Sequence, residues 1–268
     1  MQQLETFAVC KDPPYKIRAN IEHATKLGLP PLTPVFPPID KSMVIVGGGP
    51  TIKEQEMIDE IDRLSQDERF DVFALNKVPV HLAEHGITPR VHVLLDADPD
   101  CIDYLSAASK DTIYFISSQC DPCIFEALKD HNVVIWNSFN DTGILEELGL
   151  PFVGGPGTTV GLRSLSLGYQ LGYRRFELYG YDSCLIEDDH YAYDDKIEGA
   201  AEAILNVMVA GRTWKCNVNH LMQKDDFVRH LHIFHDCKIR FHGDGLLRHV
   251  HNTMMAKVRM LEAEQAVA

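Results

Sequence analysis

The stretch that decides the fold runs from residue 42 to residue 51 and reads SMVIVGGGPT. Val44, Ile45 and Val46 are β-branched residues typical of a buried strand, and three glycines follow them at once. Glycine lets a backbone approach a phosphate closely, and a helix that begins near Pro50 would present N–H groups to an anion. We therefore predict a nucleotide-binding turn formed by Gly47, Gly48, Gly49, Pro50 and Thr51.

The spacing of this glycine turn differs from two well-known phosphate-binding motifs. It lacks the GxGxxG pattern of ordinary dinucleotide folds, and no Walker lysine follows it. A tight turn that binds no ligand is the alternative interpretation. The position of the turn directly after the first strand of a sheet favours a bound nucleotide over a turn without a ligand.

Short apolar runs alternate with helical stretches on the C-terminal side of this turn. Runs typical of strands cover residues 43–46, 70–75, 91–95, 112–116, 132–136 and 175–180, and helical spacing covers 52–64, 78–85 and 158–171. Such alternation predicts an α/β fold with a Rossmann-like, doubly wound and mostly parallel sheet. Ligands bind such sheets beyond the carboxyl ends of the strands, so the loops at those ends are the candidates for a site.

The chain divides into three regions. Residues 1–40 hold half of the fourteen prolines, which predicts an arm that wraps on the surface or on a partner subunit of a homo-oligomer, or else an irregular leader. Residues 41–195 are the predicted Rossmann-like nucleotide-binding domain. Residues 196–268 are predicted to be mainly helical and packed on the same domain, with helices over 197–209, 218–234 and 246–261 and a strand over 238–241.

The composition excludes several classes of function. The formal net charge of -14 argues against broad binding to nucleic acid, which depends on lysine and arginine contacts to phosphates. No run of about 18 apolar residues is present, so we expect no membrane span. The first residues do not resemble a signal peptide, and we expect a cytoplasmic protein. A single CxxC pair at residues 120–123 does not complete a four-cysteine zinc site.

Polar residues follow two of the expected strands. Asn76 comes directly after the run at 70–75, where its amide could bind a base, a ribose or a phosphate, or cap the next helix. Three alternate carboxylates follow the run at 91–95. Mg²⁺ is often bound by one or two carboxylates together with phosphate oxygens, so these residues predict a metal site, with a capped turn as the alternative: Asp96, Asp98 and Asp100.

Two further segments carry candidate residues. A second glycine-rich turn precedes the helix at 158–171, and it offers N–H groups and hydroxyls to a phosphate or carboxylate through Gly155, Gly157, Thr158 and Thr159. Asp182 follows the last strand of the Rossmann-like region, where a catalytic or ligand-orienting carboxylate is expected. His190 is a candidate general base or acid because histidine is the residue type whose free side chain has the pKa nearest neutrality, and an exposed loop histidine is the alternative.

Taken together, these motifs resemble two related groups of proteins. The turn GGGPT resembles the G-x-G-P-S/T turn of the MptE-like family, which is named after archaeal 6-hydroxymethylpterin diphosphokinase and includes bacterial motility accessory factors. It also resembles the turn of bacterial CMP-sialic-acid-dependent sialyltransferases. Further similarity lies in FALNK at 73–77, HGITP at 85–89, VLLDAD at 93–98, LGYRRFELYGYD at 171–182 and HYAY at 190–193.

The resemblance covers roughly residues 42–195 and implies a Rossmann-like fold with a nucleotide donor. Two departures matter. The sialyltransferases have an asparagine inside the first glycine turn, where Gly48 stands here. Basic residues that would hold a pyrophosphate are not evident beyond Arg163 and Lys77.

The resemblance implies three functions. The leading one is transfer of a sugar from a CMP-linked donor to a small-molecule or glycan acceptor. The first glycine turn and Asn76 would then hold the nucleotide, Thr158 and Thr159 the sugar or phosphate, and His190 or Asp182 would assist proton transfer. The alternative is a Mg²⁺-dependent diphosphokinase that moves pyrophosphate from ATP to a pterin-type alcohol, favoured by the three aspartates. The third is a non-catalytic nucleotide-binding or assembly protein.

Overall fold

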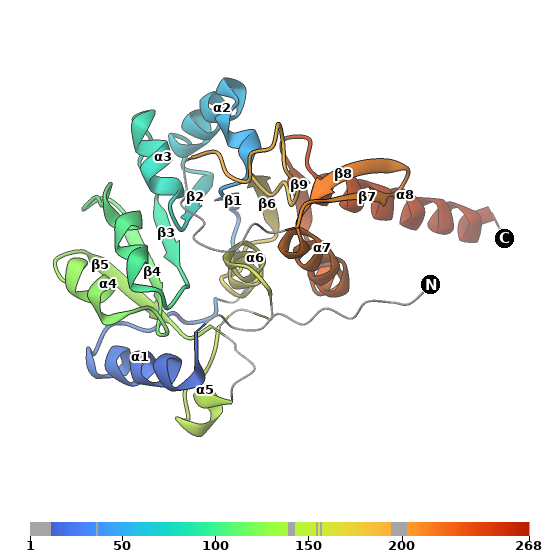
Figure 1. Cartoon of the computed structure of the whole chain (residues 1–268). Helices are drawn as coiled ribbons and strands as arrows, with labels where there is room; N and C mark the ends of the chain where they lie inside the picture. The colour runs from blue at the N-terminus through green and yellow to red at the C-terminus, as the bar shows by residue number, and fades with distance from the viewer. Residues whose placement is uncertain are drawn as a thin grey trace.

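A seven-stranded sheet forms the centre of the molecule, with strand order β5-β4-β3-β2-β1-β6-β9 (Figure 1). The computed structural model describes residues 12–35, 37–138, 143–153, 155, 157–193 and 203–267, with side chains to residue 260. Every pairing between neighbouring strands is parallel, which confirms the predicted doubly wound α/β fold. The strands are β1 Ser42–Val46, β2 Phe70–Leu75, β3 Val91–Leu94, β4 Ile113–Ser117, β5 Asn132–Trp136, β6 Arg175–Tyr179 and β9 Lys238–Phe241.

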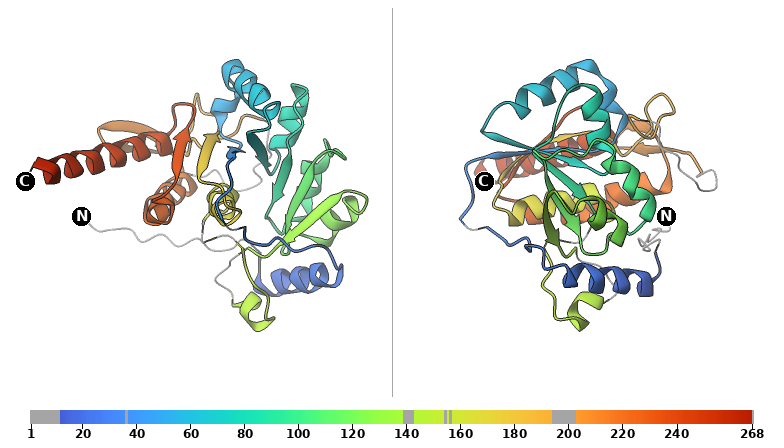
Figure 2. Two further views of the ribbon diagram at one scale, coloured as in Figure 1. Left: turned by 180° about the vertical axis from the view of Figure 1, so that it is seen from behind. Right: turned by 90° about the vertical axis from the view of Figure 1, so that its left-hand side faces the viewer.

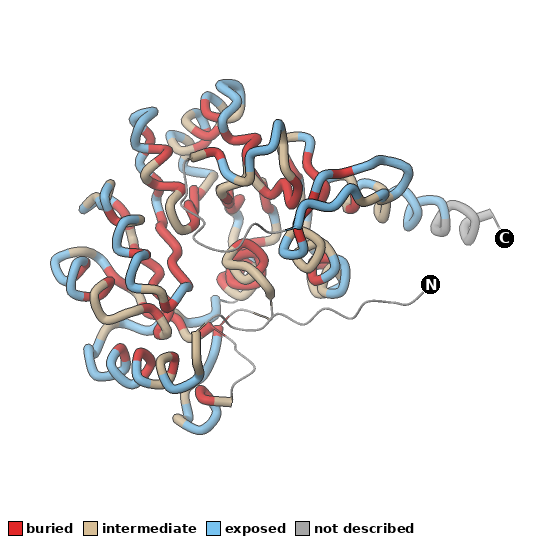
Figure 3. The backbone as a smooth tube through the Cα atoms, in the orientation of Figure 1, coloured by how far each residue is buried: buried red, intermediate tan, exposed pale blue. Residues whose placement is uncertain are grey.

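Helices cover both faces of this sheet, and β1 is buried along its whole length (Figure 3). Alternate residues of a strand point to opposite faces. Met43 and Ile45 therefore pack with α6 Val160–Gln170 and with the C-terminal elements, whereas Val44 and Val46 pack with α2 Gln55–Ser65 and α3 Val78–Glu84. This two-sided burial explains why β1 is a continuous apolar run rather than an alternating one.

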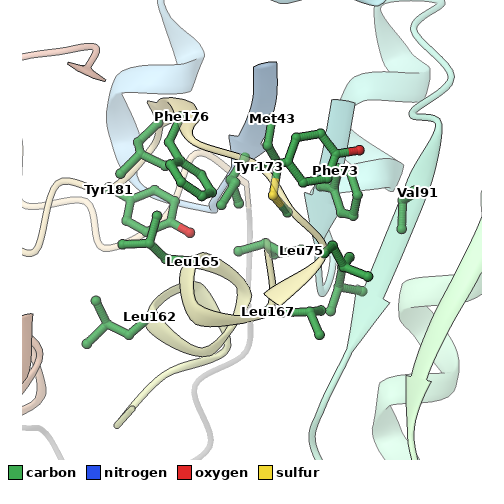
Figure 4. Packing of buried hydrophobic residues seen from close by; sticks show 14 of the residues in the cluster. Met43, Phe73, Leu75, Val91, Leu162, Leu165, Leu167, Tyr173, Phe176 and Tyr181 are labelled. Atoms are coloured by element: carbon green, nitrogen blue, oxygen red, sulfur yellow. The ribbon is translucent and has the colours of Figure 1, made fainter. Parts of the chain in front are cut away.

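Helix α6 lies close to the sheet because two of its residues are glycines. A Cβ atom on Gly168 would overlap the sulfur of Met43 and would lie 2.8 Å from Cε1 of Phe176. A Cβ atom on Gly161 would lie 3.2 Å from the ring of Tyr181. Figure 4 shows these partners packed around α6, and the lack of a Cβ atom at both glycines allows this close packing.

The N-terminal arm contains a helix that the sequence analysis did not predict. Helix α1, Pro14–Lys26, buries Ile17, Ile21 and Ala24 against the body of the molecule. Its partners include α5, Ile144–Glu147, and the segment after β3. The proline-rich stretch then runs along the edge of the sheet, where Leu32 N donates to the Ile135 carbonyl and Ile135 N donates to the Pro30 carbonyl. The arm thus covers the outer edge of β5 within the same chain.

The C-terminal region contains a hairpin in place of part of a predicted helix. We predicted a helix over residues 197–209, and this is wrong for the described residues 203–209. Strand β7, Leu205–Val209, pairs antiparallel with β8, Arg212–Cys216. Ala210 and Gly211 both have positive φ, the backbone of a type I′ turn, which joins two antiparallel strands tightly. Residues 194–202 lie outside the described residues.

The remaining C-terminal elements agree with the sequence. Helix α7, Val218–His230, continues into the 3-10 helix η3, Leu231–Phe234, and β9 adds a seventh strand beside β6. Helix α8, Leu246–Val267, begins against the sheet and its second half extends away from the body (Figures 1 and 2). No helix among the described residues is long and apolar enough to cross a membrane.

Candidate functional site

The candidate residues lie at the carboxyl end of the sheet, because all seven strands are parallel and each candidate segment follows the end of a strand or leads into a helix. The chain adds β2 to β5 on one side of β1 and then returns to place β6 on the other side. The strand order therefore reverses between β1 and β6, which is where doubly wound sheets bind ligands. The first glycine turn follows β1, and residues 180–183 follow β6 at the same edge.

The first glycine turn is bonded to the segment that follows β6. Gly49 N donates to the Gly180 carbonyl at 3.0 Å, and Gly47 N donates to the Tyr179 carbonyl at 2.8 Å. Thr51 N donates to Oδ2 of Asp182 at 2.9 Å, and the Thr51 hydroxyl donates to Oδ1 at 2.8 Å. A carboxylate of the chain itself thus occupies a position at which we predicted the anion of a ligand.

The glycines of this turn are explained by that close approach. A Cβ atom on Gly49 would lie 2.5 Å from Oδ2 of Asp182, and one on Gly47 would lie 2.8 Å from the Gly180 carbonyl oxygen. Pro50 begins the 3-10 helix η1, Pro50–Lys53, and the α-helix starts only at Gln55. The predicted cradle of free N–H groups at a helix start is therefore not formed by this turn.

Asp182 is buried, with 2% of its surface exposed. Desolvation raises the pKa of its carboxyl group to about 6, although the hydrogen bonds from Thr51 oppose the shift. Both carboxyl oxygens face Thr51 rather than an open space. These contacts hold Asp182 against the first glycine turn, and its catalytic role stays a prediction.

The second glycine-rich turn is also bonded to a carboxylate of the chain. Thr158 N donates to Oδ2 of the buried Asp226, from α7, at 2.7 Å. The Thr159 hydroxyl caps α6 by accepting from Leu162 N at 3.3 Å, and it also accepts from Nε2 of Gln223. The N–H of Thr158 and the hydroxyl oxygen of Thr159 are therefore engaged within the protein.

The hydroxyl of Thr158 and the guanidinium of Arg163 are the groups of this turn that favour a bound ligand. The hydroxyl oxygen of Thr158 is buried and has no hydrogen-bond partner among the described residues. Nε of Arg163 donates to the Gly157 carbonyl at 2.8 Å, which brings a guanidinium to the turn. Gly155 packs against Ser166 of α6, where an added Cβ atom would lie 3.1 Å from the serine oxygen. Residues 154 and 156 lie outside the described residues.

Asn76 and Asp96 lie side by side at the ends of β2 and β3. Nδ2 of Asn76 donates to Oδ2 of Asp96 at 3.2 Å, while Oδ1 of Asn76 is buried without a hydrogen-bond partner among the described residues. Asn76 has φ of 49°, a left-handed backbone that asparagine tolerates better than most residues. The neighbouring His92 fixes this backbone by a 2.7 Å contact between its Nε2 and the Asn76 carbonyl oxygen.

Asp96 lies beside Asn76, past the carboxyl end of β3. The residue is exposed to solvent, yet desolvation by the surrounding protein raises the pKa of its carboxyl group. The hydrogen bond from Asn76 and the positive charge of Arg163 act in the opposite direction. Arg163 also donates to the hydroxyl of Ser138, beyond β5, at 2.6 Å.

The segment with His190 lies across the first glycine turn. Ala192 N donates to the Gly48 carbonyl at 3.0 Å, and a Cβ atom on Gly48 would overlap the hydroxyl of Tyr193. The rings of Tyr191 and Tyr193 stack with centroids 5.6 Å apart. Sequence reasoning missed this tyrosine pair, although its spacing of two residues in an extended segment places both rings on one side.

His190 has another histidine as its neighbour. The ring centroids of His190 and His220, from α7, are 5.4 Å apart. Burial, together with the positive charge of His190, lowers the pKa of His220 to about 4. His220 is therefore neutral at pH 7 and adds no positive charge beside His190.

Comparison with known proteins identifies the family of the chain. The family model described as 6-hydroxymethylpterin diphosphokinase MptE-like matches residues 16–188 of the chain. The chain belongs to the MptE-like family. The match begins within α1, so the family domain starts well before the first strand. No match was found among curated proteins.

The fold of this MptE-like chain is also that of a solved glycosyltransferase. It is similar to the structure of the MAf glycosyltransferase from Magnetospirillum magneticum AMB-1, with a TM-score of 0.64 and 17% sequence identity. The similarity covers 85% of this chain and 37% of that protein, so the MptE-like chain spans well under half of its length.

The three aspartates of this MptE-like chain do not form one ligand set. Oδ1 of Asp98 accepts from Asp100 N at 3.0 Å and thereby caps the 3-10 helix η2, Pro99–Leu105. Within the described ranges, no group of three or more histidine, cysteine, aspartate or glutamate side chains can hold a metal ion. Asp96 remains the candidate metal-binding residue of the three, because it does not cap a helix and Mg²⁺ can bind one carboxylate together with phosphate oxygens. The Mg²⁺ cofactor stays a prediction that rests on Asp96.

Proposed function

We propose that this MptE-like protein transfers a sugar from a CMP-linked donor to a small-molecule or glycan acceptor, and that the nucleotide binds at Asn76 and Asp96. The observation that carries the proposal is the buried Oδ1 of Asn76, which has no hydrogen-bond partner in the described part of the chain. The family, and the glycosyltransferase that shares the fold, support the broader class of transferase.

The unpartnered oxygen of Asn76 costs stability unless a ligand uses it. A buried acceptor without a partner costs about 1–3 kcal/mol, and left-handed backbone costs on the order of 1–2 kcal/mol for most residues. Such costs gather at binding sites because a ligand repays them. A ribose hydroxyl or the exocyclic amine of cytosine would donate to Oδ1, while Nδ2 stays bonded to Asp96.

The proposed reaction uses groups from three elements. The hydroxyl oxygen of the acceptor attacks the anomeric carbon, the bond from that carbon to the phosphate breaks, and the nucleotide leaves. His190 accepts the proton of the hydroxyl as the general base, a role that histidine side chains often fill. Arg163 and the hydroxyl of Thr158 stabilise the charge that develops on the leaving phosphate.

A diphosphokinase is the second candidate, and Asp96 is the observation that favours it. An accessible carboxylate would suit a divalent cation, which when bound would neutralise the charge of phosphate oxygens. In this function ATP and a pterin-type alcohol take the places of the sugar donor and the acceptor. The third function, nucleotide binding without turnover, uses the same residues.

The first experiment compares ligands and an Asn76→Gly variant by thermal unfolding. CMP, CMP-sialic acid and ATP are each tested with and without Mg²⁺. A ligand at 100 times its Kd stabilises the protein by about 2.7 kcal/mol. Glycine accepts positive φ without strain, so Asn76→Gly removes the side chain but leaves the backbone unstrained. We expect CMP to stabilise the wild type without metal and the variant much less.

The outcomes separate the three functions. Stabilisation by ATP only in the presence of Mg²⁺, abolished in an Asp96→Asn variant, would replace the glycosyltransferase with the diphosphokinase. Nucleotide binding without turnover, even when acceptors are supplied, would favour the non-catalytic function. Failure of every nucleotide to change the unfolding temperature would overturn the proposal.

A further inference from the structure

A cleft lies beside the first glycine turn, on the face of the sheet covered by α2 and α3. Its volume is about 460 Å³. η1, α3 and the end of the segment across the glycine turn enclose it, and its walls are Lys53, Lys77, Val80, His81, Glu84, Ala192 and Tyr193. The described residues of this cleft include none of the side chains proposed above to hold the nucleotide.

The cleft gathers positive charge in a strongly acidic protein. The chain carries a formal net charge of -14, yet Lys53 and Lys77 both line this cleft and Glu84 is its one carboxylate among the described residues. The ammonium group of Lys77 lies 5.5 Å from the ring centroid of Tyr193. A local group of cations inside a cleft attracts anions whatever the sign of the whole molecule.

The existing partner of Lys53 can be exchanged for a ligand. Lys53 forms an ion pair with Asp189, and the two side chains are 45% and 51% exposed. Ion pairs with such exposure contribute about 0–1 kcal/mol. An anion that enters the cleft therefore loses little by replacing Asp189 as the partner of Lys53.

We infer that this cleft binds a phosphate or carboxylate group between the ammonium groups of Lys53 and Lys77, with Tyr193 as a wall. The inference rests on the proposed function, because two features connect the cleft to the proposed nucleotide site at Asn76 and Asp96. Lys77 directly follows Asn76, and Tyr193 contacts both the cleft and Gly48. The bound group is thus either a phosphate of the donor or an acidic group of the acceptor.

The test measures binding of inorganic pyrophosphate to the full chain by calorimetry. Lys53→Gln and Lys77→Gln each remove one ammonium group from the cleft. Lys215→Gln is the matched control, because Lys215 forms an ion pair with Asp188 of similar exposure and lies outside the cleft. We expect each cleft variant to weaken binding about tenfold or more, which corresponds to ~1.4 kcal/mol. Lys215→Gln should bind as the wild type does.

Equal affinities in the wild type and both cleft variants would overturn the inference. A second titration, in the presence of CMP, identifies the source of the anion. Displacement of pyrophosphate by CMP assigns the cleft to the donor phosphate, and simultaneous binding assigns it to the acceptor. If no nucleotide binds at all, the proposed function fails, while the lysine variants still decide whether the cleft binds pyrophosphate.

Discussion

The carboxyl group of Asp182 accepts the hydrogen bonds that the first glycine turn was predicted to donate to a bound phosphate. A glycine turn after a first strand predicts a bound phosphate, but here a carboxylate bonds to the N–H and hydroxyl of Thr51. The two residues are 131 positions apart in the chain. Local sequence could place each at a strand end, but it could not predict their contact, which depends on β6 lying beside β1.

The buried carboxyl group of Asp182 makes stability depend on pH. Its pKa is raised from 3.8 to about 6 in the folded protein, so the folded state retains a proton that the unfolded state releases. This contribution to stability is complete below pH 4 and is lost as the pH rises to 6. Asp182→Asn removes the titration, so its free energy of unfolding relative to wild type should increase by up to about 3 kcal/mol between pH 4 and 6.

Urea unfolding at several pH values measures this difference. Asp236→Asn is a suitable control, because Asp236 is an aspartate on the surface whose pKa is lowered by Arg174. A parallel pH dependence for wild type and Asp182→Asn would contradict the prediction.

At the scale of elements, α6 links the core to the candidate site. Its first turn carries Thr159 and Arg163, and its later turns lie against β1 and β6 through Gly168. The helical spacing and both packing glycines could be read from the sequence. The role of Asp226 at the start of α6 could not, because it comes from α7, 68 residues after Thr158.

Gly168→Ala should show how closely α6 packs. The added methyl group would overlap Met43 and crowd Phe176, and overpacking of a core costs about 1–3 kcal/mol. A Met43→Ala exchange, harmful alone because it leaves a cavity, makes room for that methyl group. A double-mutant cycle measured by urea unfolding should therefore give a favourable coupling free energy of roughly 1 kcal/mol or more.

Strictly additive effects of the two substitutions would indicate that α6 can move away from the sheet. The expected coupling is specific to this helix position, because the sulfur of Met43 is the atom nearest to an added Cβ on Gly168.

Two elements were missed for different physical reasons. Helix α1 buries three residues against partners far along the chain, and its prolines at the start suggested an irregular arm. The hairpin β7–β8 depends on Ala210 and Gly211 with positive φ, and alanine rarely adopts that backbone. A turn with asparagine in place of Ala210 would have been recognisable from the sequence.

At the scale of the whole molecule, the C-terminal region completes the core. Phe227, Phe234, Phe241 and Leu247 belong to the same buried cluster as Met43 and Ile45. β9 also supplies the neighbour of β6 in the sheet. The sequence boundary near residue 195 is therefore not a boundary of the hydrophobic core.

A chain truncated after residue 195 should fail to form a cooperative structure. It would expose the apolar residues that α7, β9 and α8 cover, and it would leave β6 as an open edge. We expect loss of the near-ultraviolet circular dichroism signal and of a sharp unfolding transition. A chain truncated after residue 260, which keeps the part of α8 that packs on the sheet, serves as the control. A cooperative transition in the shorter chain would contradict the prediction.

The parallel arrangement was predictable as a class, because β1 to β6 alternate with α-helices or 3-10 helices along the chain. Which strand lies beside which was not predicted, and that order decides which loops meet. Asn76 meets Asp96 because β2 lies beside β3. The cleft with Lys53 and Lys77 was missed for the same reason, since η1 and α3 come together only in the folded sheet.

The central position of β1 has a consequence for synthesis. Its residue Ser42 pairs in register with Arg175, 133 positions later in the chain. A ribosome that adds roughly 5–20 residues per second takes on the order of ten seconds to reach that partner. During this interval β2 can pair with one side of β1, while the other side is an apolar strand with unsatisfied backbone groups. One edge of β1 therefore stays without its strand partner until β6 has left the ribosome.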